Sequence, residues 1–135
     1  MKHFKISEFD SPDLEGSGQK MDKVFLKLLD QARDRAGVPF KILSGYRTIE
    51  HNLNVAGGRV GSSHLFGLAA DIYLPKSSRD RFLIINALLE VGFNRLGISF
   101  DRGFIHVDND TTLFNTTSLY SVNLAGIENE KLILV

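Results

Sequence analysis

The sequence predicts an α+β domain with a mainly antiparallel sheet flanked by helices. Two amphipathic helical patterns occur among short apolar stretches typical of strands, and a hairpin-like turn, Asp101-Arg102-Gly103, joins two of those stretches. Apolar residues make up 43% of the 135 residues and charged residues 24%, close to globular averages. No internal repeat, low-complexity tract or linker is visible, so we expect a single domain over residues 1–135.

The N-terminal half predicts one helix, one strand and a long polar segment. The helix is expected at about Asp22–Ala36, where apolar residues recur every three or four positions and Gly37 follows. Phe40–Ser44 alternates like a short strand. Residues 45–67 are rich in Gly, Ser, Asn and Arg, with one short helix expected after Thr48. A polar stretch of this length inside a compact domain usually serves function or is disordered.

The C-terminal half predicts a second helix and the rest of the sheet. The helix is expected to begin at a cap formed by Ser77 or Ser78 and to end at Val91, before Gly92. Strands are expected at Leu68–Leu74, Phe93–Phe100, Phe104–Asp108 and Lys131–Val135.

Charge and composition exclude several classes of function. Lys and Arg total 16, as do Asp and Glu, so the chain lacks the basic excess with which proteins neutralise nucleic-acid phosphates. No apolar run approaches the ~20 residues of a membrane span, and the first residues lack the roughly 7–15-residue apolar core of a signal peptide. Cysteine is absent. Any metal must therefore be bound by His, Asp or Glu.

Strand alternation places two residues of metal-binding type on the side opposite to the core. Asp71 in one strand and His106 in another point away from the apolar face of their strands. A buried lone carboxylate or imidazole is costly unless it is paired or binds a metal. If the two strands are neighbours, Asp71 and His106 meet, and the preceding loop supplies His64. These three residues are a plausible zinc set with a fourth position left for water. A His–Asp hydrogen bond that braces the sheet explains the same pattern.

Three further polar residues have both a functional and an ordinary interpretation. Arg47 ends a strand, where its guanidinium could clamp a carboxylate or an oxyanion, or form a surface salt bridge. Ser62 could hydrogen-bond a substrate backbone or cap a turn. His51 is most simply a solvated or loop-bracing residue, with a role near the substrate as the alternative.

Five segments together resemble the zinc D-Ala-D-Ala carboxypeptidase family, in particular its short single-domain branch in bacteria and phages. They are, in chain order, Ser44–Thr48, Glu50–Asn52, Gly57-Gly58, Ser62–Ile72 and Phe104–Asp108. The likeness runs from about Phe4 through Asp108. It implies the hedgehog/DD-peptidase-like fold, an antiparallel sheet flanked by helices.

The resemblance also implies the chemistry of the site. Zinc would be held by His64, Asp71 and His106, Arg47 would help bind substrate and stabilise the developing oxyanion, and Ser62 would lie near the substrate. The substrates implied are peptidoglycan stem peptides, cut at D-Ala-D-Ala or at another bond by a carboxypeptidase or a related endopeptidase.

The general base is where this sequence departs from the family. Many relatives have an acidic residue or a second histidine two or three positions before the last ligand, and here those positions are Phe104 and Gly103. Asp101 and Asp108 are the two candidates for the base, and Asp108 is alternatively a partner that orients a metal ligand.

We therefore expect zinc-dependent amide hydrolysis by a monomer. The alternative is a metal-containing domain that binds cell-wall peptide, or a protein partner, without cleaving it. Because no export signal is visible, we expect a cytoplasmic protein, or a phage-associated one that reaches the cell wall by lysis or virion delivery.

Overall fold

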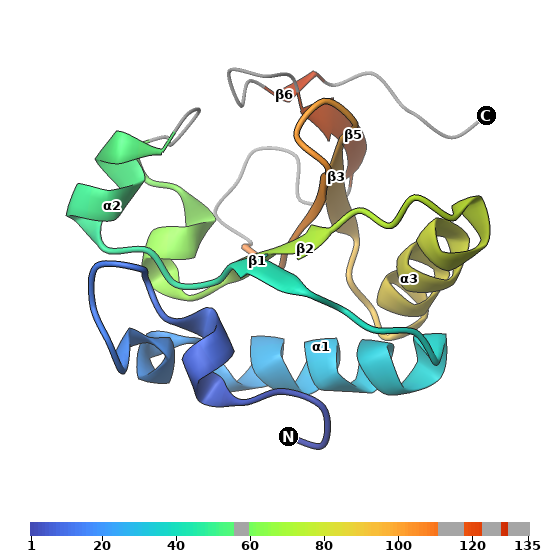
Figure 1. Ribbon diagram of the computed structural model, residues 1–135, viewed down its shortest axis with the longest axis horizontal. Helices are drawn as coiled ribbons and strands as arrows, with labels where there is room; N and C mark the ends of the chain where they lie inside the picture. Colours follow the sequence, from blue (N-terminus) through green and yellow to red (C-terminus); the bar gives the residue numbers. More distant parts are fainter. Residues whose placement is uncertain (56–59, 111–117, 123–127, 130–135) are drawn as a thin grey trace.

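The computed structural model describes residues 1–55, 60–110, 118–122 and 128–129 (Figure 1). Its α-helices are α1 (Lys23–Ala36), α2 (Ile49–Asn54) and α3 (Ser78–Glu90). Its 3-10 helices are η1 (Ile6–Phe9), η2 (Ser17–Lys20) and η3 (Ser63–Phe66). Its strands are β1 (Ile42–Ser44), β2 (Ala69–Tyr73), β3 (Arg95–Ser99), β4 (Phe104–Asp108), β5 (Ser118–Val122) and β6 (Glu128–Asn129). Within these described ranges, no helix is long and apolar enough to cross a membrane.

The strands form one sheet in the order β1-β2-β4-β3-β5-β6. All neighbouring pairs are antiparallel except β3 and β5, which are parallel. The α+β class and the mainly antiparallel sheet are therefore confirmed. β5 and β6 are additional to the predicted strands, and the strand expected at Lys131–Val135 lies outside the described residues.

The two long helices, α1 and α3, begin and end within about one residue of the positions that the sequence predicts. The Asp22 side chain accepts a hydrogen bond from the backbone N–H of Phe25 and so caps α1, and Gly37 follows the end of this helix with a φ of 67°. Thr48 caps α2 and Ser77 caps α3 in the same way. Side-chain caps of this kind satisfy backbone N–H groups that have no partner within the helix.

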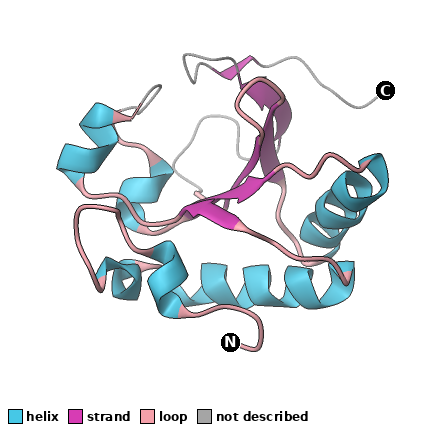
Figure 2. Ribbon diagram, viewed as in Figure 1, coloured by secondary structure: helices cyan, strands magenta, loops and turns pink. Residues whose placement is uncertain are grey.

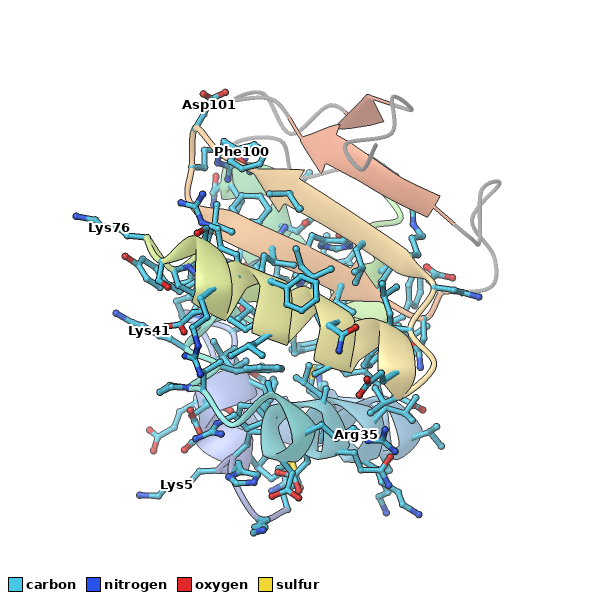
Figure 3. The ribbon with its side chains drawn as sticks, turned by 90° about the vertical axis from the view of Figure 1, so that its right-hand side faces the viewer. Lys5, Arg35, Lys41, Lys76, Phe100 and Asp101 are labelled. Carbon is cyan, nitrogen blue, oxygen red and sulfur yellow. The ribbon has the colours of Figure 1, made fainter. Side chains whose placement is uncertain are left out.

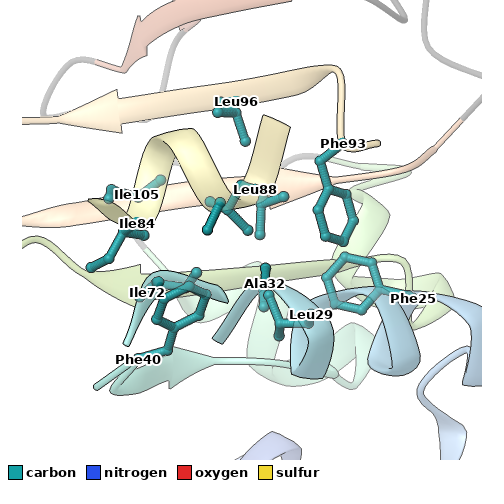
Figure 4. Packing of buried hydrophobic residues seen from close by; sticks show 14 of the residues in the cluster. Phe25, Leu29, Ala32, Phe40, Ile72, Ile84, Leu88, Phe93, Leu96 and Ile105 are labelled. Atoms are coloured by element: carbon teal, nitrogen blue, oxygen red, sulfur yellow. The ribbon is translucent and has the colours of Figure 1, made fainter. Parts of the chain in front are cut away.

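The core lies between one face of the sheet and the pair α1 and α3, which Figure 2 shows along the same side of the strands. Figure 4 shows apolar side chains of both helices directed toward Ile72 and Ile105 of the sheet. The rings of Phe25 and Phe93 close one end of this layer in an edge-to-face contact, with centroids 5.4 Å apart. Ile72 and Ile105 are fully buried.

The other face of the sheet carries the polar residues. Ile72 and Ile105 belong to the core, whereas the alternating positions Asp71 and His106 do not. The same register that pairs Ile72 with Ile105 pairs Asp71 with His106. The predicted separation into an apolar and a polar face is therefore confirmed for β2 and β4.

Two glycines allow the N-terminal segment to pack closely against the backbone that follows β1 and η3. At Gly45, a Cβ would lie 2.7 Å from the Cα of Phe9, and the neighbouring Tyr46 N–H donates to the Phe9 carbonyl. Gly67 has a φ of 70°, and a Cβ there would lie 2.8 Å from the Cα of Met21. No other residue fits at these positions without displacing backbone.

Candidate metal centre

His64, Asp71 and His106 converge on one point of the polar face. Each offers a ligand atom within 4.8 Å of the other two. His64 comes from η3, and Asp71 and His106 lie opposite each other on β2 and β4. The structure therefore brings together the three residues that the sequence nominated as metal ligands.

His64 is held with one ring nitrogen available for a ligand. Its Nδ1 lies 2.7 Å from the carbonyl oxygen of Gly45. A carbonyl oxygen can only accept a hydrogen bond, so Nδ1 carries the proton and Nε2 has a free lone pair. Ser62 caps η3 by accepting from the His64 backbone N–H. The His64 residue is 2% exposed, and burial lowers its pKa. A neutral imidazole is the form that binds metals.

The Asp71 carboxylate lies between both histidines and an arginine. Its Oδ1 is 2.9 Å from His106 Nδ1 and 3.4 Å from His64 Nε2, and its Oδ2 accepts from Arg47 Nη2 at 3.0 Å. Burial alone would raise the pKa of Asp71, but the two imidazoles outweigh burial and hold this pKa well below its usual range. Asp71 is therefore an ionised carboxylate that faces both histidines.

His106 is bracketed by two carboxylates. Its Nε2 lies 2.7 Å from Asp108 Oδ2, on the side of the ring opposite to Asp71. Burial disfavours the charged ring, yet the contacts with Asp108 and Asp71 raise the pKa of His106 to about 9. Asp108 is fully buried and also accepts from Arg95 Nε at 3.1 Å. A cation at Nδ1 would replace the proton that now bridges His106 and Asp71.

The donor set fits zinc. Two imidazoles and one carboxylate are typical of catalytic zinc sites with three protein ligands. Donor atoms at about 2.0–2.2 Å from a shared ion lie at most about 4.4 Å apart, close to the 4.8 Å spread of this group. The second nitrogen of each histidine is already oriented, by the Gly45 carbonyl for His64 and by Asp108 for His106. Such partners fix the ring orientation of metal-binding histidines.

Arg47 is a buried brace and not a surface salt bridge. It is 8% exposed. Besides Asp71, its guanidinium donates to Ser44 Oγ at 3.0 Å and to Asn52 Oδ1 at 3.3 Å. Burial lowers the pKa of Arg47, Asp71 raises it, and the charge of Arg102 lowers it further. Arg47 therefore fixes the oxygen of Asp71 that faces away from the histidines.

The two candidates for the general base lie in different surroundings. Asp108 is buried against His106 and Arg95. Asp101 is exposed at the tip of the turn between β3 and β4 (Figure 3), and among the described residues it forms no hydrogen bond or ion pair with a ligand residue. Ser62 lies beside His64 as a cap. His51 belongs to α2, where its backbone N–H donates to Thr48.

Arg95 and Asn52 are the site residues that the sequence reasoning missed. Arg95 lies two positions before Gly97, which pairs with His106. Strand alternation therefore places Arg95 on the same face of the sheet as His106. Asn52 was visible only as a neighbour of His51, and the fold is needed to bring it to Arg47.

Comparison with known proteins identifies one family. The sequence model described as Peptidase M15 matches residues 2–108, a span that contains every residue of the centre. No curated protein and no solved structure gives a significant match.

Proposed function

The chain belongs to the peptidase M15 family, and we propose on this basis that it is a zinc-dependent peptidase acting on cell-wall stem peptides, with a DD-peptidase-like fold. Peptidases of this family are zinc-dependent. The observation that carries the proposal is the convergence of His64, Asp71 and His106 within 4.8 Å on the polar face of the sheet. A zinc peptidase requires such a centre together with a source of positive charge for the developing oxyanion.

In this proposal each polar residue has a defined task. When bound, zinc polarises the peptide carbonyl and lowers the pKa of water toward ~7. His64, Asp71 and His106 hold the ion, and Arg47 holds Asp71 in place. Arg47 uses three of its five N–H donors on Ser44, Asn52 and Asp71. We assign the remaining donors to the substrate carbonyl. Ser62 lies next to His64, where a peptide backbone would pass.

The contacts of Asp108 favour a positioning role. Its Oδ2 accepts from Arg95 and lies against His106, and its Oδ1 accepts from the backbone N–H of Asp110. This fully buried carboxylate is thus already engaged by three protein groups. We therefore assign the orientation of His106 to Asp108 and the general base to Asp101, the exposed member of the pair.

The proposal is tested by metal analysis followed by digestion of purified sacculi. The purified protein should contain about one zinc ion per chain and should release stem-peptide fragments, and a chelator should abolish the release. His64→Ala should remove both zinc and activity while the domain stays folded. His51→Ala is the matched control, because His51 lies outside the centre, and it should retain both. Full zinc occupancy in His64→Ala would contradict the ligand set.

A second candidate function is a domain that binds cell-wall peptide without cleaving it. The observation that favours it is the lack of an acidic side chain at Gly103 and Phe104, three and two positions before His106. This candidate predicts that zinc-loaded protein cosediments with sacculi but releases no fragment. Chelator-sensitive release would exclude it.

A further inference from the structure

The polar face of the sheet is organised in three rows that cross β3, β4 and β2. In strand register the rows are Arg95–Asp108–Ala69, Gly97–His106–Asp71 and Ser99–Phe104–Tyr73. Phe104 is 9% exposed but does not belong to the core cluster. Its ring therefore contributes to the polar side of the sheet, one row from the metal ligands.

Arg102 lies over this ring. The centre of its guanidinium is 5.2 Å from the centroid of the Phe104 ring, within the range of a cation–π contact. The turn that carries Arg102 is tied down by its backbone. The N–H of Arg102 donates to Ser99 Oγ, the N–H of Gly103 donates to the Ser99 carbonyl, and the Gly103 carbonyl accepts from Leu74. The guanidinium therefore projects from a fixed turn onto a fixed ring.

Three arginines lie near the centre, and they differ in how their charge is neutralised. Arg47 is paired with Asp71, and Arg95 with Asp108. Within the part of the chain that the structure describes, no carboxylate lies at ion-pair distance from Arg102. Among the described residues, Arg102 is therefore the arginine near the centre that has no carboxylate partner, and it lies over Phe104, one row from the metal ligands.

We propose that Arg102 binds the C-terminal carboxylate of the substrate peptide, so that the enzyme removes a single terminal residue. This inference rests on the proposed function. A guanidinium that stacks on an aromatic ring keeps its N–H edge free for a carboxylate, which it binds with two parallel hydrogen bonds. Arg102 is then the residue that distinguishes a carboxypeptidase from an endopeptidase.

The spacing of the rows agrees with a single residue beyond the scissile bond. Residues two positions apart on one strand, such as His106 and Phe104, lie about 7 Å apart. One peptide residue spans about 3.3–3.6 Å, and a charge-assisted hydrogen bond about 2.8 Å. A peptide whose scissile carbonyl lies over His106 therefore presents the carboxylate of its next residue to the Arg102 guanidinium, which lies over Phe104.

The test compares two substrates that differ in one group. A stem peptide ending in D-Ala-D-Ala is supplied with a free C-terminal carboxylate or as the C-terminal amide. The zinc-loaded protein should cleave the acid about 10- to 100-fold more efficiently than the amide. Arg102→Ala should remove this preference by raising KM for the acid, with little change for the amide and unchanged zinc content. Arg102→Lys should restore part of the preference, because it keeps the charge but not the paired hydrogen bonds.

Arg79→Ala is the matched control, since Arg79 is an exposed arginine of α3 that pairs with its neighbour Asp80. It should leave the kinetics of both substrates unchanged. If Arg102→Ala is poorly folded, Arg102→Gln replaces it, because glutamine keeps a long side chain on the same turn.

Equal cleavage of acid and amide by the unsubstituted protein would overturn the inference but not the proposed peptidase activity. Equal losses for both substrates in the Arg102 variants would do the same. Failure of the zinc-loaded protein to cleave either peptide or sacculi would overturn the proposed function, and the inference with it.

Discussion

His106 owes its position to carboxylates on opposite sides of its ring. Asp71 lies at Nδ1 and Asp108 at Nε2, so the ring can neither rotate nor flip without losing a buried contact. Asp108 is itself held by Arg95. The chain of Arg95, Asp108 and His106 therefore presents one ring nitrogen to the centre in a fixed direction, as metal-binding histidines require.

Asp108→Asn tests this arrangement. Asparagine preserves the shape of the side chain but removes the charge that orients His106 and neutralises Arg95. We expect zinc affinity to fall about 10- to 100-fold, with the free energy of unfolding lowered by about 3–5 kcal/mol because the buried charge of Arg95 loses the Asp108 carboxylate. Competition with a chromophoric chelator and denaturant unfolding measure the two effects. Unchanged zinc affinity in a folded variant would contradict the orienting role.

Asp101→Asn tests the general base. Because Asp101 is exposed and contacts none of the ligands within the described residues, its replacement should leave zinc content and stability unchanged. Loss of a general base typically lowers the rate about 10²- to 10⁴-fold, and we expect a fall in kcat of that order with KM little altered. The measurement is steady-state hydrolysis of a stem peptide. A kcat equal to that of the unsubstituted protein would remove Asp101 from the mechanism.

Among the secondary-structure elements, β2 and β4 show how far the sequence can predict the site. Alternation within each strand was enough to place Asp71 and His106 on the face opposite to the core, because apolar residues occupy every other position. The pairing of the two strands could only be assumed from the sequence, since register depends on contacts between residues far apart in the chain.

The elements that were missed depend on the same kind of long-range pairing. β5 has the sequence Ser-Leu-Tyr-Ser-Val, in which apolar and polar residues do not alternate. It pairs in parallel with β3, so no hairpin turn reveals it either. The contact between Arg95 and Asp108 likewise needs the register of β3 against β4. Local patterns predicted single site residues and helix caps. The hydrogen bonds that link Arg95, Asp108 and His106 could be found only once the strand register was known.

The end of η3 is an element whose backbone conformation the site requires. Gly67 combines a positive φ with a close approach to the backbone of Met21, three residues after His64. Gly67→Ala should lower the free energy of unfolding by more than the roughly 1–2 kcal/mol that a left-handed conformation costs a non-glycine residue, and should weaken zinc binding by shifting η3. The readouts are denaturant unfolding and zinc affinity.

Gly37→Ala is the control for this prediction. Gly37 has a similar φ of 67°, but an added Cβ there meets nothing within 4 Å. The conformational cost alone should appear, without loss of zinc affinity. If both alanine variants lose the same stability and bind zinc equally, close packing at Gly67 does not position the metal ligand.

In the molecule as a whole, the residues that stabilise the fold and the candidate metal ligands lie on opposite faces of the sheet. The face toward α1 and α3 is apolar and closed, and the opposite face carries the ligands. Substitutions on the two faces should therefore act independently, because sites that share no partner usually contribute additively to stability.

Zinc should nevertheless stabilise the entire fold, because its ligands come from η3, β2 and β4 and are brought together only in the folded chain. A ligand that binds the folded state alone adds about 2.7 kcal/mol of stability at 100 times its Kd, which corresponds to about 10 °C in Tm for a chain of this size. We expect that difference between zinc-loaded and chelated protein by calorimetry, and none in His64→Ala. Ile84→Val, a conservative change in the core on α3, should lower Tm in both conditions but preserve the difference. A Tm that is the same with zinc and with chelator, or a zinc-dependent rise that persists in His64→Ala, would show that the ion does not bind through the three residues proposed.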